Sequence, residues 1–104
     1  MRRVATINTL KPLDYLAALY KSQGNYDAAL PLHLGCLDKR KRIFGEDHPD
    51  TLSSMNNLGS CYQDMDRLEK ARALLEECVK ATKRVLGPQN LDTLRYTDNL
   101  APRY

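Results

Sequence analysis

Among the residues that could do chemistry, His33 and Cys36 stand out because they lie three positions apart, a spacing that places both on one face of a helix. A histidine and a thiol can bind zinc, but a structural zinc site normally has four ligands in paired spacings. Only His48, Cys61 and Cys78 remain to complete such a site, and they are scattered along the chain. Free cysteines are common in hydrophobic cores. We therefore expect structural cysteines, and no metal or other cofactor.

A group of acidic side chains in the second half of the chain could supply a general acid and a base, but basic residues lie among them. The charged residues concerned are Glu69, Lys70, Glu76, Glu77, Lys80 and Arg84. Glu76 and Lys80 are four residues apart in the order that stabilises a helix, which is typical of a solvated helix face. The chain also has no Gly-rich phosphate loop and no Ser, His and Asp constellation. The sequence therefore predicts a protein without catalytic activity.

The elements that carry these residues repeat along the chain. The segment that begins at Gly45 returns at Gly87, an offset of 42 residues. The same offset relates Leu16, Leu58 and Leu100, Tyr20, Tyr62 and Tyr104, Ala29 and Ala71, and Cys36 and Cys78. Self-similarity at a fixed period of this size is typical of a solenoid, in which stacked repeats bury a continuous core.

The residues of the repeat resemble the tetratricopeptide signature. The best copy is Met55, Leu58, Gly59, Tyr62, Ala71 and Leu75, and the first copy is Leu13, Leu16, Ala17, Tyr20, Ala29 and His33. The period of 42 residues is similar to that of the long-helix repeats of kinesin light chains. The resemblance implies an all-α helical-hairpin solenoid of five helices and about two and a half repeats. We expect an N-terminal extension at 1–8 and a repeat domain at 9–104, with units at about 9–45, 50–87 and 92–104.

The chain departs from this signature at the start of each unit and near its end. Leu13, Met55 and Thr97 replace the bulky aromatic residue of the family. Pro102 falls inside the first helix of the third unit, where it removes a hydrogen bond and clashes with the preceding turn. We therefore expect the last helix to kink or end near Ala101.

Punctuating residues predict where the helices begin and end. Helices are expected at about 9–23, 26–44, 50–64, 67–86 and 92–101. Asn8, Asp50 and Asp92, or their neighbours, are expected to cap helix starts, and Pro12 and Pro49 to lie in or just before a first turn. Gly24, Gly45 and Gly87 are expected to end helices in the left-handed conformation, with Asp66 in the place of Gly24 in the second unit. Gly59 and Ala17 are expected to face Ala71 and Ala29 where helices approach closely.

Composition and charge restrict the class of protein. The net charge of +3 does not by itself indicate nucleic-acid binding. The basic run 39–42 and the residues Lys80, Lys83 and Arg84 fall late in the second helix of each unit, where they complement the helix dipole. No segment has the roughly 18 apolar residues of a membrane helix. The odd number of cysteines, 3, favours a reducing, cytoplasmic location over a disulfide framework.

The resemblance implies a concave groove lined by the first helix of each unit. In the family, an Asn immediately before the signature Leu contacts the main chain of a bound peptide, and here it corresponds to Asn57 and Asn99. Tyr15 occupies that place in the first unit. Neighbours expected on the same faces are Lys11, Ser53, Ser60, Asp64 and Arg95. Lys11 and Arg95 favour an acidic peptide. Alternatively, Asn57 and Asn99 only bond between adjacent helices.

Three functions therefore remain open for a repeat protein of this kind. The first is an adaptor that binds an extended peptide or partner helix in the groove. The second is an architectural piece that self-associates or stacks through the open faces at 1–25 and 88–104, because exposed apolar patches favour association. The third, nucleic-acid binding through residues 39–42, is the least favoured.

Overall fold

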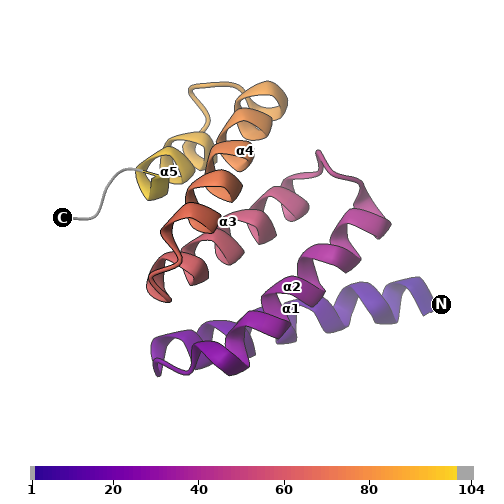
Figure 1. Ribbon diagram of the computed structural model, residues 1–104. Helices are drawn as coiled ribbons and strands as arrows, with labels where there is room; N and C mark the ends of the chain where they lie inside the picture. The colour runs from indigo at the N-terminus through magenta and orange to yellow at the C-terminus, as the bar shows by residue number, and fades with distance from the viewer. Residues whose placement is uncertain (1, 101–104) are drawn as a thin grey trace.

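The computed structural model describes residues 2–100 and the side chains of residues 11–100, and all regular structure in this part of the chain is α-helical. The helices are α1 (Arg2–Ser22), α2 (Tyr26–Phe44), α3 (Pro49–Asp64), α4 (Leu68–Leu86) and α5 (Leu91–Leu100). Each helix packs against the next along the chain, and α5 also contacts α3. Figure 1 shows α1 with α2, and α3 with α4, as two hairpins. The predicted all-α helical-hairpin fold of five helices is confirmed.

Most helix boundaries follow the predicted punctuation. Gly24, Gly45 and Gly87 have φ angles of +77°, +92° and +90°, and Asp66 has a φ of +63°. Glycine adopts this left-handed conformation without steric cost, whereas Asp66 adopts it as one of the few other residue types that tolerate it. These stops separate α1 from α2, α2 from α3, α3 from α4 and α4 from α5, as expected.

The starts of α3 and α5 are capped by neighbours of the aspartates named above. His48 is the N-cap of α3, where its Nδ1 accepts a hydrogen bond of 3.0 Å from the backbone N–H of Asp50. At α5, the backbone N–H of Asp92 donates to Asn90 Oδ1 at 2.8 Å. Each of these caps satisfies a backbone donor that a helix start leaves unpaired.

The first helix is longer than predicted. It begins at Arg2, not near residue 9, and Pro12 therefore lies in the helix interior and not in its first turn. No Gly or Pro occurs between Arg2 and Lys11, so nothing in this segment stops a helix. Pro31 lies inside α2 in the same way. The predicted end near Ala101 falls outside the described residues.

The core is formed where α2, α3, α4 and α5 meet. It contains Leu37, Leu52, Met55, Leu58, Cys78, Val79, Ala81 and Tyr96. Cys36, Cys61 and Cys78 are buried and form no disulfide bond, as the packing pattern predicted for Cys36 and Cys78. Burial raises the pKa of both Cys36 and Cys78 to about 11. These two thiols therefore stay protonated near neutral pH, which favours packing over nucleophilic chemistry.

Equivalent positions of the repeat differ in their burial. Leu58 in α3 is 3% exposed, but Leu16, its counterpart in α1, is 38% exposed. Leu19 of α1 and Leu91 and Leu94 of α5 are also exposed. The two outer first helices thus carry apolar side chains on their surfaces.

Candidate functional site

A pocket lies where α1, α2 and α3 meet, and its volume is about 120 Å³. Its walls combine charged, polar and small apolar side chains from all three helices. The lining residues are Asp14, Ala18 and Lys21 from α1, His33 from α2, and Asn56, Asn57 and Ser60 from α3. Two of the residues predicted for the groove, Asn57 and Ser60, therefore lie together in this pocket.

Lys21 links the two first helices at one side of the pocket. Its Nζ donates to Ser60 Oγ at 2.9 Å and forms an ion pair of 3.2 Å with Asp64. Ser60 and Asp64 were predicted to face a ligand, and both are contacted by this side chain. The repeat pattern did not indicate Lys21, because the equivalent residue of the second unit is Gln63.

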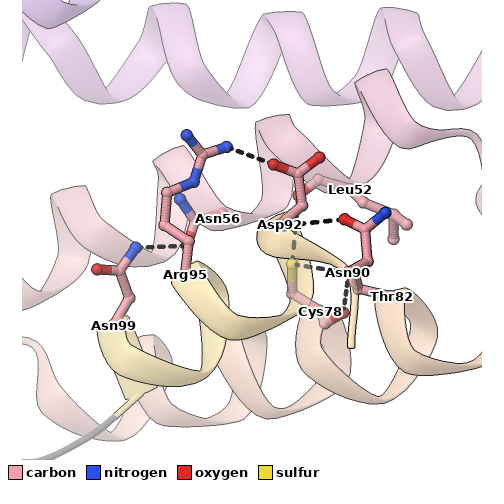
Figure 2. A network of polar contacts seen from close by, with 8 residues as sticks. All are labelled: Leu52, Asn56, Cys78, Thr82, Asn90, Asp92, Arg95 and Asn99. Carbon is pink, nitrogen blue, oxygen red and sulfur yellow. Dashed lines mark hydrogen bonds and ion pairs between the residues drawn. The ribbon is translucent and has the colours of Figure 1, made fainter. Parts of the chain in front are cut away.

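The two asparagines predicted to contact a ligand have different surroundings. Asn99 Nδ2 donates to Asn56 Oδ1 at 2.8 Å, which joins α5 to α3, as Figure 2 shows. Gln63 Nε2 also donates to the backbone oxygen of Asn99 at 2.7 Å. Asn57, in contrast, makes no side-chain hydrogen bond within residues 11–100. A bond between adjacent helices is thus present for Asn99, whereas the amide of Asn57 is available.

His33 forms a buried part of the pocket wall. It is only 5% exposed, and its Nε2 has no hydrogen-bond partner among the described residues. Burial, assisted by the charge of Lys21, lowers the pKa of His33, so the ring is neutral at pH 7. The corresponding residue of the second unit is Leu75, so a polar side chain replaces an apolar one at this repeat position. That replacement is the signal in the sequence from which a polar wall at this place could have been predicted.

Metal binding by His33 and Cys36 receives no support from the geometry. Within the described residues, no group of three or more His, Cys, Asp or Glu side chains is arranged to hold a metal ion. The two residues instead occupy the buried face of α2. His33 also lines the pocket.

Arg40 of α2 contacts both α1 and α3 and so joins three helices. Its Nη1 and Nη2 donate to Asp14 Oδ1 and Oδ2 at 3.1 Å and 2.5 Å, and Nη1 also donates to Ser54 Oγ at 2.6 Å. The sequence placed Arg40 in a basic run that complements the dipole of the helix, and the structure adds that Arg40 is only 5% exposed. The reason is helical spacing: Arg40 continues the buried stripe of Ala29, His33 and Cys36. Only Lys39, Lys41 and Arg42 of that run are exposed.

The remaining predicted residues lie outside this pocket. Lys11 is exposed on α1, and Tyr15 on the same helix is 77% exposed. Ser53 is half-buried on α3. Arg95 donates to Asp92 at 2.9 Å and lies over the ring of Tyr96 (Figure 2 shows the contact with Asp92). The structure therefore gathers only part of the predicted set.

Comparison with known proteins agrees with the helical repeat fold. The family model described as tetratricopeptide repeat matches residues 6–84 and, in a second alignment, residues 50–102. The two matches together span nearly all of the chain and overlap in the second unit. A search of curated proteins found no significant match. Among the described residues, no helix has the length and apolar character needed to span a membrane.

Proposed function

The chain belongs to the tetratricopeptide repeat family, whose members are generally protein-interaction modules, and from this premise we propose that it binds an extended peptide against α1 and α3. The observation that carries the proposal is the unengaged amide of Asn57 at the pocket between these helices. An Asn side chain offers two N–H donors and an acceptor oxygen, which match the alternating groups of an extended backbone. Such a contact fixes the position of a peptide without selecting its sequence.

Charge pairing within the protein bears on the ligand. Arg95 is paired with Asp92, and Lys21 is paired with Asp64. These contacts compensate two of the positive charges that the first helices of the repeat units carry. Lys11 remains exposed on α1. The pairing argues against a strong preference for acidic peptides, which Lys11 and Arg95 had favoured.

Finer features of the proposal rest on the sequence pattern. The 42-residue period supports repeats of the kinesin light chain type, with units at about 9–45, 50–87 and 92–104. The three buried cysteines, none of them in a disulfide bond, support a reducing, cytoplasmic location. The role proposed is that of an adaptor without catalysis or cofactor.

The test uses Asn57→Ala with a matched amide substitution, Gln89→Ala, as control. Gln89 is exposed between α4 and α5, away from the pocket. Because the chain contains no Trp, binding can be followed by the emission of random-sequence peptides that each carry one Trp. We expect Asn57→Ala to weaken the binding of these peptides about tenfold, which corresponds to the loss of one or two hydrogen bonds. The melting temperature should stay unchanged. A loss of stability with unchanged affinity would contradict the proposal.

A second candidate function is self-association through the outer helices. It is favoured by the exposure of Leu16 and Leu19 on α1 and of Leu91 and Leu94 on α5. Contiguous exposed apolar side chains commonly mark association surfaces. Light scattering over a range of protein concentrations separates the two: a size that grows with concentration supports self-association, and a constant monomer mass argues against it.

A further inference from the structure

The pocket between α1, α2 and α3 has a composition that suits one kind of guest. We propose that it selects a carboxamide side chain, Asn or Gln, from the bound peptide; this inference rests on the proposed function. Three properties of the pocket lead to it: its size, the compensation of its charges, and the hydrogen-bonding groups that the protein leaves unpaired.

The pocket is large enough to hold a small polar side chain. Its volume is about 120 Å³, and a site needs roughly 10–15 Å³ of this kind of volume to hold one water molecule. The pocket therefore has room for several water-sized groups. The side chain of Asn, with its Cβ, carbon, oxygen and nitrogen, fits within it, and so does the polar end of Gln.

The charges of the pocket are already paired, which disfavours a charged guest. Asp14 is held by the guanidinium of Arg40, and Lys21 by the carboxylate of Asp64. A peptide carboxylate would be placed close to Asp14, and a peptide ammonium close to Lys21. Moving either ion out of water into this site would cost free energy without a free counter-ion to offset it. A neutral polar group avoids this cost.

The unpaired groups require a guest that both donates and accepts. His33 Nε2 is buried without a partner among the described residues, and the amide of Asn57 is unengaged. The pocket also contains the carboxylate of Asp14, which can accept more than the two hydrogen bonds that Arg40 donates. A carboxamide has an NH₂ group for Asp14 and an oxygen for a donor such as Asn57 or the His33 ring in its Nε2–H form. A hydroxyl or methyl group satisfies fewer of these groups.

The experiment compares peptides that differ only at one position. Random octapeptide libraries are prepared with a single position fixed, in turn, as Gln, Glu, Asn, Asp, Lys or Ala, and are bound to the wild-type chain and to His33→Leu. Gln and Glu form the decisive pair because they have the same shape. Leucine is the natural replacement because Leu75 occupies the equivalent position in the second unit. The imidazole ¹⁵N resonance of His33 in the wild-type chain is followed in parallel.

The expected result is that, at one fixed position, Gln or Asn binds about tenfold more tightly than Glu, Asp, Lys or Ala, an effect of one or two hydrogen bonds in a partly buried site. His33→Leu should reduce the advantage of Gln or Asn over the other residues to about twofold. The Nε2 resonance should shift with the Gln peptides and not with the Ala peptides, a readout that does not depend on the folding of the variant.

Other results separate the inference from the function on which it rests. The amide selectivity is overturned if the Gln and Asn peptides bind no more tightly than the others, if the Glu or Asp peptides bind more tightly, or if the His33 resonance does not respond to Gln. Each of these results leaves the peptide-binding function in place. Failure of every library to bind the folded wild-type chain overturns both.

Discussion

Gly59 of α3 lies directly against the side chain of Leu75 of α4. A Cβ atom at Gly59 would stand 2.6 Å from Leu75 Cδ2 and 2.7 Å from Leu75 Cγ. The nearest side chain is thus Leu75 and not Ala71, which the repeat pattern had suggested. Because Leu75 is fully buried, it cannot move aside without disturbing its own neighbours.

Gly59→Ala is therefore expected to destabilise the fold. Overpacking of a core contact costs about 1–3 kcal/mol, and the better helix propensity of Ala offsets about 0.5–1 kcal/mol of this cost. The net loss of unfolding free energy can be measured by urea denaturation. The matched control is Gly35→Ala in α2, where a Cβ would meet no atom within 4 Å. This control should gain stability by about 0.5–1 kcal/mol, and equal effects at both glycines would contradict the prediction.

The ion pair of Arg40 and Asp14 is expected to be important for stability because one partner is buried. Asp14→Asn would leave the guanidinium, whose side chain is only 6% exposed, without a counter-ion. Removing one partner of a buried pair costs about 3–5 kcal/mol, and the partial exposure of Asp14, at 27%, reduces our expectation to about 2–3 kcal/mol. Thermal and urea melts measure the loss.

Asp38→Asn provides the matched control, because Asp38 and Arg42 form the same kind of pair on the surface of α2. Their side chains are 57% and 76% exposed. An exposed pair of this spacing contributes only about 0.3–0.5 kcal/mol. A loss at Asp14 as small as that at Asp38 would show that the buried pair is replaced by water or by another contact.

The protonation of His33 predicts how stability depends on pH. Its pKa is lowered in the folded chain by burial and by Lys21, with Asp14 acting in the opposite direction. In the unfolded chain the ring titrates near its ordinary pKa of about 6.5. Below that pH the unfolded state binds a proton that the folded state resists, so the stability present above about pH 6.5 falls as the pH is lowered towards the folded pKa.

His33→Leu should remove this part of the pH dependence. Urea melts at about pH 7.5 and about pH 5 should show a smaller difference for the variant than for the wild-type chain, because the wild-type difference includes protonation of His33 in the unfolded state. The lower pH stays above the ordinary pKa values of Asp and Glu, about 3.9 and about 4.3, so most carboxylates remain ionised. Identical pH dependence in both proteins would show that the pKa of the ring is not lowered in the folded state.

Local signals in the sequence were sufficient for most of the architecture. Each stop at Gly24, Gly45 and Gly87 depends on the backbone freedom of one residue, and the 42-residue offset transferred the same rule to Asp66. The start of α1 was missed because the repeat placed Asn8 as its cap and Pro12 in its first turn, on the pattern of Asp50 and Pro49 in the second unit. The helix instead continues back to Arg2 through a segment that contains no Gly or Pro.

The site was predicted less well because its geometry depends on contacts between helices. Asn57 and Ser60 could be placed from the repeat, but the partners of Asn99 and Ser60 could not. Arg40 and His33 were recognisable only from their register on the buried face of α2, where a charged and a polar residue follow the same spacing as Ala29 and Cys36. In the sequence, Arg40 was instead grouped with its basic neighbours at the end of the helix.

The hydrogen bonds of the Arg40 guanidinium have a consequence for how the groove could change during evolution. Nη1 and Nη2 both donate to Asp14, which lines the pocket from α1, and Nη1 also donates to Ser54 on α3. The single side chain of Arg40 therefore fixes the distance between α1 and α3, the two helices that line the groove. Substitutions at this core position would alter ligand preference without touching a ligand, so specificity in this chain can drift through residues that a survey of the binding surface would not include.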